Sequence, residues 1–251
     1  MHNSDDRKLR ACDITDAIGL LTRLPVTSDG TRGARAAWAW PLAGVAVAFI
    51  AVCVGWITSL LGVPAPLIAA LVLGVQIMAT GALHEDGLAD CADGFWGGMD
   101  RERRLTIMKD SRIGVYGVVA LVLALMVRWS ALTLLIEADA LFGALIATAA
   151  LSRVPMVALM ATLPPAREDG LSRLVGRPDQ DTALVAAALA ATLALITIGF
   201  SAVPVAVIIV AVAFGLGRLA LSRIGGQTGD VLGASQQLSE IGALIILTTL
   251  L

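Results

Sequence analysis

The sequence predicts an all-α protein, a polytopic membrane helix bundle that forms one catalytic domain over residues 1–251. Hydrophobic residues make up 57% of the chain and charged residues only 15%, and the mean hydropathy is +0.84. In addition, apolar runs near the roughly 20 residues that cross a bilayer recur along the chain. Nucleic-acid binding is not expected, because there is no basic domain and aromatic residues make up only 4%.

About seven membrane-spanning helices are expected from these apolar runs. Pro64, Asp139 and Pro204 stand at turns between them. The expected spans are 36–61, 66–83, 113–136, 139–162, 182–200, 203–222 and 236–251.

Ahead of the first span, residues 1–35 are expected to form a cytoplasmic tail that contains one amphipathic helix. Ile14, Ile18 and Leu21 recur at spacings of four and three residues, with charged residues off that face. This pattern predicts a helix that lies on the membrane surface and ends before Pro25. A helix packed against the protein's cytoplasmic face explains the same spacing equally well.

The distribution of lysine and arginine predicts the orientation of the chain. The connections at 62–65, 137–139 and 201–202 carry neither residue. The N-terminal tail, the 84–112 segment and the 163–181 loop are basic. By the positive-inside rule the N-terminus and both of these segments are cytoplasmic. The residues with candidate chemistry would then share the cytoplasmic face.

An acidic stripe opens the 84–112 segment, which is predicted to be catalytic. Asp86, Asp90 and Asp93 stand at i, i+4 and i+7, so a helix places them on one face. A divalent cation would relieve their repulsion, and carboxylates suit Mg²⁺ or Mn²⁺. Glu85 is close enough to that face to be a fourth ligand or a base. A solvated acidic helix end is the alternative reading.

His84 does not indicate a zinc site. No second histidine follows four residues later, and His2 is the only other histidine in the chain. His84 is expected to be a hydrogen-bonded residue at the membrane interface.

Basic side chains that follow the stripe are candidates for binding phosphate. Arg104, Lys109 and Arg112 could hold a phosphate or diphosphate opposite a metal, although positive-inside topology explains any one of them. Arg153 and Arg167 are further candidates for an anionic substrate. Snorkelling to the interface is the simpler account of Arg153, which lies within a predicted span.

A third polar stretch, residues 225–240, leads into the last span. Asp230 is expected to complete the metal site or to accept a proton, because an ionisable group beside an apolar helix is a functional candidate. Thr228, which lies between Gly226 and Gly229, is a candidate substrate contact. The alternative for Asp230 is a helix N-cap.

Three segments resemble a known family at these positions. They are LHEDGLADCADGFWGG (83–98), IMKDSRIGVYG (107–117) and TGDVLGASQQLSE (228–240). They are similar to the signature segments of cobalamin synthase, the adenosylcobinamide-GDP ribazoletransferase family, and occur in the family's order. Cys91 departs from the pattern, since a small polar residue is expected there.

The resemblance implies an enzyme of the bacterial inner membrane that acts late in vitamin B12 biosynthesis. It would join adenosylcobinamide-GDP to α-ribazole or its 5′-phosphate, release GMP and require Mg²⁺. Expected partners are the two substrates and membrane lipid; a homo-oligomer or an association with other cobalamin-assembly enzymes is left open. In this reading Glu85, Asp86, Asp90 and Asp93 hold the metal and Asp230 or Glu85 activates the ribose hydroxyl.

Two other functions compete with this reading. The acidic segment is similar in style to that of CDP-alcohol phosphotransferases, but Asp90 follows Ala89 where they have arginine, and no later GxxxDxxxD occurs. A cation-coupled transporter could use the aspartates as a cation path. However, they lie at the end of a span, whereas transport sites usually lie near the midplane. A non-catalytic scaffold would tolerate loss of their charge.

Overall fold

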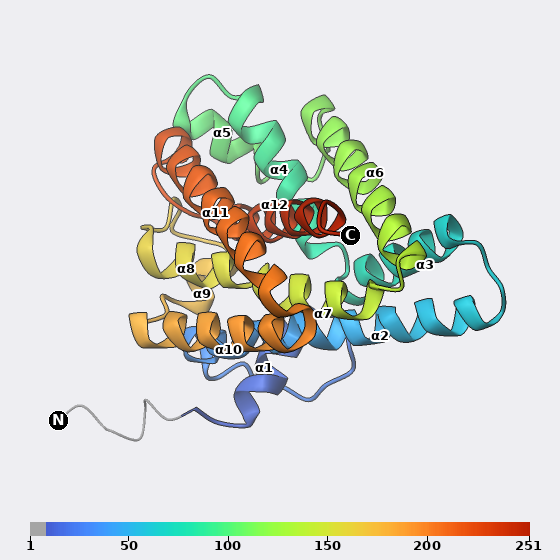
Figure 1. The fold of residues 1–251 in the computed structure, drawn as a ribbon. Coiled ribbons are helices and arrows are strands. Elements are labelled where there is room, and N and C mark those ends of the chain that lie inside the picture. The colour runs from blue at the N-terminus through green and yellow to red at the C-terminus, as the bar shows by residue number, and fades with distance from the viewer. Residues whose placement is uncertain (1–8) are drawn as a thin grey trace.

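The computed structural model describes residues 9–251 and confirms the all-α prediction. Residues 1–8 of the predicted tail lie outside the described part. Figure 1 shows α12 at the centre, with α4 beside it and α6 and α11 on either side. The helices are α1 (Cys12–Leu21), η2 (Gly33–Ala39), α2 (Trp40–Leu60), α3 (Ala65–Thr80), α4 (Leu83–Gly97), α5 (Arg101–Ile107), α6 (Val115–Glu137), α7 (Leu141–Leu151), α8 (Val154–Thr162), α9 (Leu171–Val175), α10 (Gln180–Ile198), η3 (Gly199–Ser201), α11 (Ala202–Ile224) and α12 (Gly229–Thr248).

Within residues 9–251, five helical stretches are long and apolar enough to cross a membrane, or six if the bent pair α3 and α4 counts as one span. One of the five is the 45-residue run of α10 and α11, which η3 interrupts. Many large apolar side chains on these helices face outward, as expected for a surface that contacts lipid. The chain therefore has the character of a membrane protein, but the predicted count of seven spans is not confirmed.

Small residues allow α2, α7 and α10 to pack closely in one layer (Figure 1). Short side chains at a helix interface let backbones approach and gain van der Waals contact where lipid offers no hydrophobic drive. The fully buried alanines of this layer include Ala48, Ala51, Ala147, Ala150, Ala190 and Ala194.

Helix α1 turns part of its polar side towards the protein. Asp13 is fully buried and accepts hydrogen bonds from Arg32 Nε and Trp38 Nε1, both at 2.7 Å. Burial raises the pKa of Asp13, but the hydrogen bonds from Arg32, Trp38 and the backbone of Arg10, together with the charge of Arg32, hold the pKa below its ordinary value. The structure thus matches the packed helix that was the alternative, and the interfacial role is not confirmed.

A sharp break between α3 and α4 positions the acidic segment. The two helices meet at 86°, and both Gly81 and Ala82 adopt the left-handed conformation at the break. As a result α4 leaves the direction of α3 and packs against α6 and α12. The acidic segment is therefore a helix within the bundle rather than a surface loop.

Candidate active site

Helices α4 and α12 approach each other closely at Gly87. A Cβ at this position would lie 2.7 Å from the carbonyl oxygen of Asp230 and 3.2 Å from the Cα of Gly233. Both are backbone atoms that cannot rotate away, so only glycine allows this contact. The contact brings the start of α12, with Asp230, against the face of α4 that carries Asp86 and Asp90.

Asp86, Asp90 and Asp230 form the centre of the candidate site. Asp90 lies within electrostatic range of Asp86, Asp93 and Asp230, and of one cation, Arg167. Asp86 and Asp230 also repel each other. Asp86 is exposed, and Asp90 and Asp230 are half-buried. We call Asp86, Asp90, Asp230 and Arg167 the acidic site; its three carboxylates exceed its single cation.

A short backbone bridge places Arg167 over Asp230. Ala166 N–H donates to the carbonyl of Gln227 at 2.8 Å, and Gln227 N–H donates to the carbonyl of Pro164 at 2.9 Å. The bridge holds the loop after α8 against the turn before α12. Arg167 Nη2 then lies 3.4 Å from Asp230 Oδ2. Residues far apart in sequence therefore meet through backbone pairing.

Thr228 is the N-cap of α12, so the alternative that Asp230 caps this helix is wrong. Thr228 Oγ1 accepts a hydrogen bond from Val231 N–H at 3.3 Å, and its hydroxyl lies 3.1 Å from Asp230 Oδ2. Thr228 is fully buried. Asp230 stands in the first turn, where the helix dipole stabilises a carboxylate.

Lys109 lies near the acidic site, and Arg112 faces solvent. Lys109 Nζ donates to Asp169 Oδ2 at 2.5 Å, and Asp169 Oδ1 is 3.9 Å from Arg167 Nε. The Lys109 hydrogen bond is the main reason that the pKa of Asp169 is lowered. Arg112 pairs with Asp110 at 2.7 Å, and its hydrogen bond lowers the pKa of Asp110 to about 2.

Two of the four predicted metal ligands have protein partners outside the acidic site. The Asp93 carboxylate accepts hydrogen bonds from Gly114 N–H (2.7 Å) and Gly117 N–H (2.9 Å) at the start of α6. Glu85 is buried and pairs with Arg128 at 2.8 Å. In the described part of the chain, no group of three or more His, Cys, Asp and Glu side chains is arranged to hold a metal ion.

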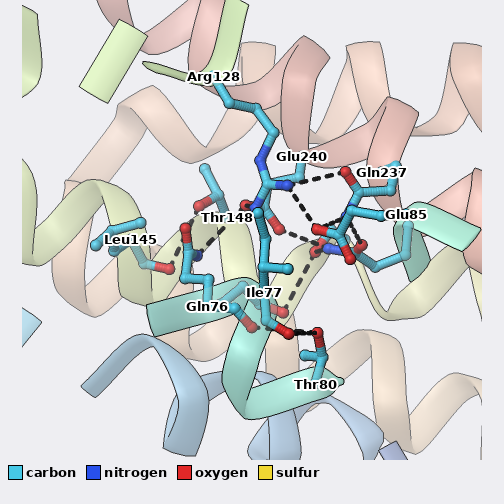
Figure 2. A network of polar contacts seen from close by, with 12 residues as sticks. Gln76, Ile77, Thr80, Glu85, Arg128, Leu145, Thr148, Gln237 and Glu240 are labelled. Carbon is cyan, nitrogen blue, oxygen red and sulfur yellow. Dashed lines mark hydrogen bonds and ion pairs between the residues drawn. The ribbon is translucent and has the colours of Figure 1, made fainter. Parts of the chain in front are cut away.

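Glu85 belongs to a second polar cluster, the buried ionic network of Glu85, Arg128, Arg153 and Glu240. Figure 2 shows Arg128 between Glu85 and Glu240. Arg128 Nη2 donates to Glu240 Oε1 at 2.9 Å, and Arg153 Nη1 is 3.6 Å from Glu240 Oε2. Gln237 donates to Glu85 Oε1 and accepts from Arg128. Arg153 is only 4% exposed, so the expectation that it snorkels to the interface is wrong.

The sequence analysis did not predict that these four charged residues pair with one another. The available signal was the set of charged residues inside apolar spans, since such groups pair with one another in a bilayer. Arg128, Arg153 and Glu240 all lie in such spans.

Arg104 donates hydrogen bonds to backbone carbonyl groups. Its guanidinium donates to the carbonyls of Gly98 at 3.0 Å, Arg223 at 3.1 Å and Met99 at 3.2 Å. These contacts tie α5 to the end of α4 and to α11. The prediction that Arg104 binds substrate has no support from this arrangement.

A largely apolar cavity opens beside the acidic site. It has a volume of about 640 Å³ including its open mouth. Asp86, Asp230 and Arg167 line its polar end. Its other walls include Leu20, Trp40, Met156, Met160, Leu171 and Val175.

Comparison with known proteins identifies the family. A family model described as cobalamin-5-phosphate synthase matches residues 13–248. The chain belongs to this family. It is 43% identical over 238 residues to an adenosylcobinamide-GDP ribazoletransferase of Mesorhizobium japonicum, covering 93% of this chain and 92% of the relative. A relative with the same name from Bradyrhizobium diazoefficiens is 44% identical over 240 residues, with coverage of 93% and 92%. No solved structure matches the chain.

Membership of the cobalamin-5-phosphate synthase family confirms the resemblance and the prediction that the chain is an enzyme. The structure adds how the quoted segments relate in space. Segment 83–98 is essentially α4, and segment 228–240 begins α12, the helix that packs against α4 at Gly87. Segment 107–117 contains Lys109 and the glycines that bind Asp93. The family's signature segments thus surround the acidic site.

Proposed function

We propose that this chain is an adenosylcobinamide-GDP ribazoletransferase, which joins adenosylcobinamide-GDP to α-ribazole or its 5′-phosphate and releases GMP. The observation that carries the proposal is the acidic site at the polar end of an apolar cavity. Relatives at 43–44% identity over most of the chain carry this name. Carboxylates and guanidinium groups together suit a reaction at a diphosphate.

In the proposed reaction a ribose hydroxyl oxygen of the nucleoside attacks the cobinamide-side phosphorus of the diphosphate. A new P–O bond forms, the bond to the GMP oxygen breaks, and the hydroxyl proton passes to a carboxylate. Asp230 is the proposed acceptor, because it lines the cavity and is held by Thr228 and Arg167. Arg167 and Lys109 would bind the diphosphate oxygens.

The donor set of the acidic site fits Mg²⁺, and Mn²⁺ would suit the same oxygens. Asp86, Asp90 and Asp230 supply hard carboxylate oxygens, and Arg167 offsets part of their mutual repulsion. Magnesium sites often combine one or two carboxylates with water and substrate phosphates, so a cage of three protein ligands is not required. When bound, the ion would neutralise charge on the diphosphate.

The proposed location is a bacterial inner membrane, with the N-terminus and the acidic site on the cytoplasmic face. The apolar helices support the membrane setting, and the lysine and arginine distribution supports the orientation. The outward-facing apolar side chains would contact lipid. An oligomer, or an association with other cobalamin-assembly enzymes, stays a prediction.

The direct test is an end-product assay on the purified protein in detergent. With Mg²⁺, adenosylcobinamide-GDP and α-ribazole, we expect equal amounts of GMP and the joined corrinoid product, and none after chelation of the metal. A CDP-alcohol phosphotransferase would instead release CMP from a CDP-alcohol, and a transporter would release no nucleotide. Failure of the wild-type protein to form GMP would overturn the proposal.

A further inference from the structure

Three side chains that line the cavity beside the acidic site carry buried polar atoms without a hydrogen-bond partner in residues 9–251. They are Trp40 (Nε1), His84 (both ring nitrogens) and Arg167 (Nη1). Trp40 is 2% exposed and His84 is 1% exposed. Buried polar groups are nearly always paired with protein or water, so such a group needs an explanation. The expectation that His84 is hydrogen-bonded at an interface is wrong in this structure.

These three groups come from separate parts of the chain. Trp40 begins α2, His84 lies near the start of α4, and Arg167 lies in the loop after α8. The other residues that line the cavity are mostly apolar, among them Met156 and Met160. His84 also borders the buried ionic network, beside Arg128 and Arg153. The cavity therefore combines an apolar body with hydrogen-bonding groups that have no partner in the protein, an arrangement typical of a ligand site.

We propose that this cavity binds the nucleoside substrate, with Trp40 as a positioning residue. The inference rests on the proposed function and assigns one substrate to one cavity. The apolar walls would hold an uncharged bicyclic aromatic base, with Trp40 Nε1–H donating to its ring nitrogen. The sugar would lie at the polar end of the cavity, near Asp86 and Asp230.

The chemistry of the walls favours this substrate over the others in the reaction. A guanine base presents polar atoms along most of its edge, and unpaired polar atoms in an apolar wall are costly. A corrinoid exceeds a cavity of about 640 Å³ that includes its open mouth. An aromatic nucleoside with one ring acceptor and sugar hydroxyls matches both the apolar area and the unpartnered groups.

Trp40→Phe tests the hydrogen bond while keeping an aromatic ring in place. We expect the KM for α-ribazole to rise about 5- to 10-fold, with kcat within twofold and the KM for adenosylcobinamide-GDP unchanged. The matched control is Trp56→Phe, in the same helix but 64% exposed on the outer surface. It should leave all three constants unchanged.

Leu171→Trp is a second test, and it changes a residue outside the buried core. Leu171 lines the cavity but is 46% exposed, so a larger side chain can block the mouth without disturbing the packing. We expect at least a tenfold rise in the KM for α-ribazole. Leu174→Trp, in the same short helix and 84% exposed, is the control. If Trp40→Phe does not fold, the Leu171 pair decides.

The outcomes separate this inference from the proposed function. GMP release by the wild type with an unchanged nucleoside KM in both variants would overturn the cavity assignment and leave the proposed function intact. An equal rise in the KM for both substrates would also overturn it, because that result indicates a general structural effect. If no GMP forms but calorimetry shows that α-ribazole binds and that both variants weaken it, the cavity assignment stands and the proposed function fails.

Discussion

Helix α4 contributes to two polar clusters that differ in charge balance. Glu85 points into the buried ionic network, and its neighbour Asp86 faces the acidic site. The network pairs two guanidinium groups with two carboxylates and is almost completely buried. The acidic site has three carboxylates, one guanidinium and partial access to solvent.

The difference indicates separate roles for adjacent residues. A buried charge is tolerated when it is paired, and a balanced cluster requires no ligand. An excess of carboxylates is instead relieved by a cation or by a positively charged partner. We therefore assign the network to holding α4, α6 and α12 together and the acidic site to chemistry. Metal binding by Glu85 and substrate binding by Arg153 stay predictions without structural support.

The largest effect is expected when a charge is removed from the acidic site. Asp90→Asn should lower GMP release about 10³-fold, because it removes a carboxylate from the proposed metal site and keeps the side-chain shape. The melting temperature in detergent should change little. Glu102→Gln, an exposed change in α5, is the control. Normal turnover of the Asp90 variant would exclude the acidic site from the chemistry.

Removing a charge from the network should affect stability instead. Arg128→Met leaves Glu85 and Glu240 without their main partner, and breaking a buried pair costs about 3–5 kcal/mol. We expect a clear fall in the melting temperature, measured by thermal unfolding in detergent. Arg218→Met, at an exposed arginine in α11, should have little effect. An unchanged melting temperature would contradict the structural role of the network.

A smaller effect is expected at the close contact of α4 with α12. In Gly87→Ala the new Cβ would lie 2.7 Å from a backbone oxygen of α12, so the helices must shift. Such overpacking typically costs about 1–3 kcal/mol, and displacement of Asp230 should also lower turnover. At Gly97, near the end of α4, a Cβ meets only Ile107 at 3.7 Å. Equal behaviour of Gly87→Ala and Gly97→Ala would disprove the close approach.

The smallest effect is expected at the exposed pair beside the acidic site. Because the Lys109 hydrogen bond lowers the pKa of Asp169, the pair stabilises the fold above the ordinary pKa of 3.8. That contribution is lost as the pH falls through the lowered pKa. Lys109→Gln should therefore differ slightly from the wild type in thermal unfolding at pH 6, and the two should converge towards pH 3. A difference that grows in acid would contradict this reading.

Local sequence signals predicted much of the site. The spacing of Asp86 and Asp90 placed them on one helical face, and α4 confirms that they lie on a helix. The spacing also grouped Asp93 with them. However, residues seven apart are about 10 Å apart along a helix, so they meet different neighbours. Asp93 consequently contacts the start of α6 instead of the acidic site.

The sequence alone determined that the chain is helical and suited to a membrane, and its motifs identified the family. Only the tertiary structure decided which charges meet. Arg128 pairs with Glu85, 43 residues earlier, because the break after α3 turns α4 towards α6. Arg167 pairs with Asp230, 63 residues later, because the backbone bridge holds the loop after α8 against the turn before α12. Periodicity describes one helix at a time. The partner of a buried charge depends on how separate helices pack, which no local pattern contains.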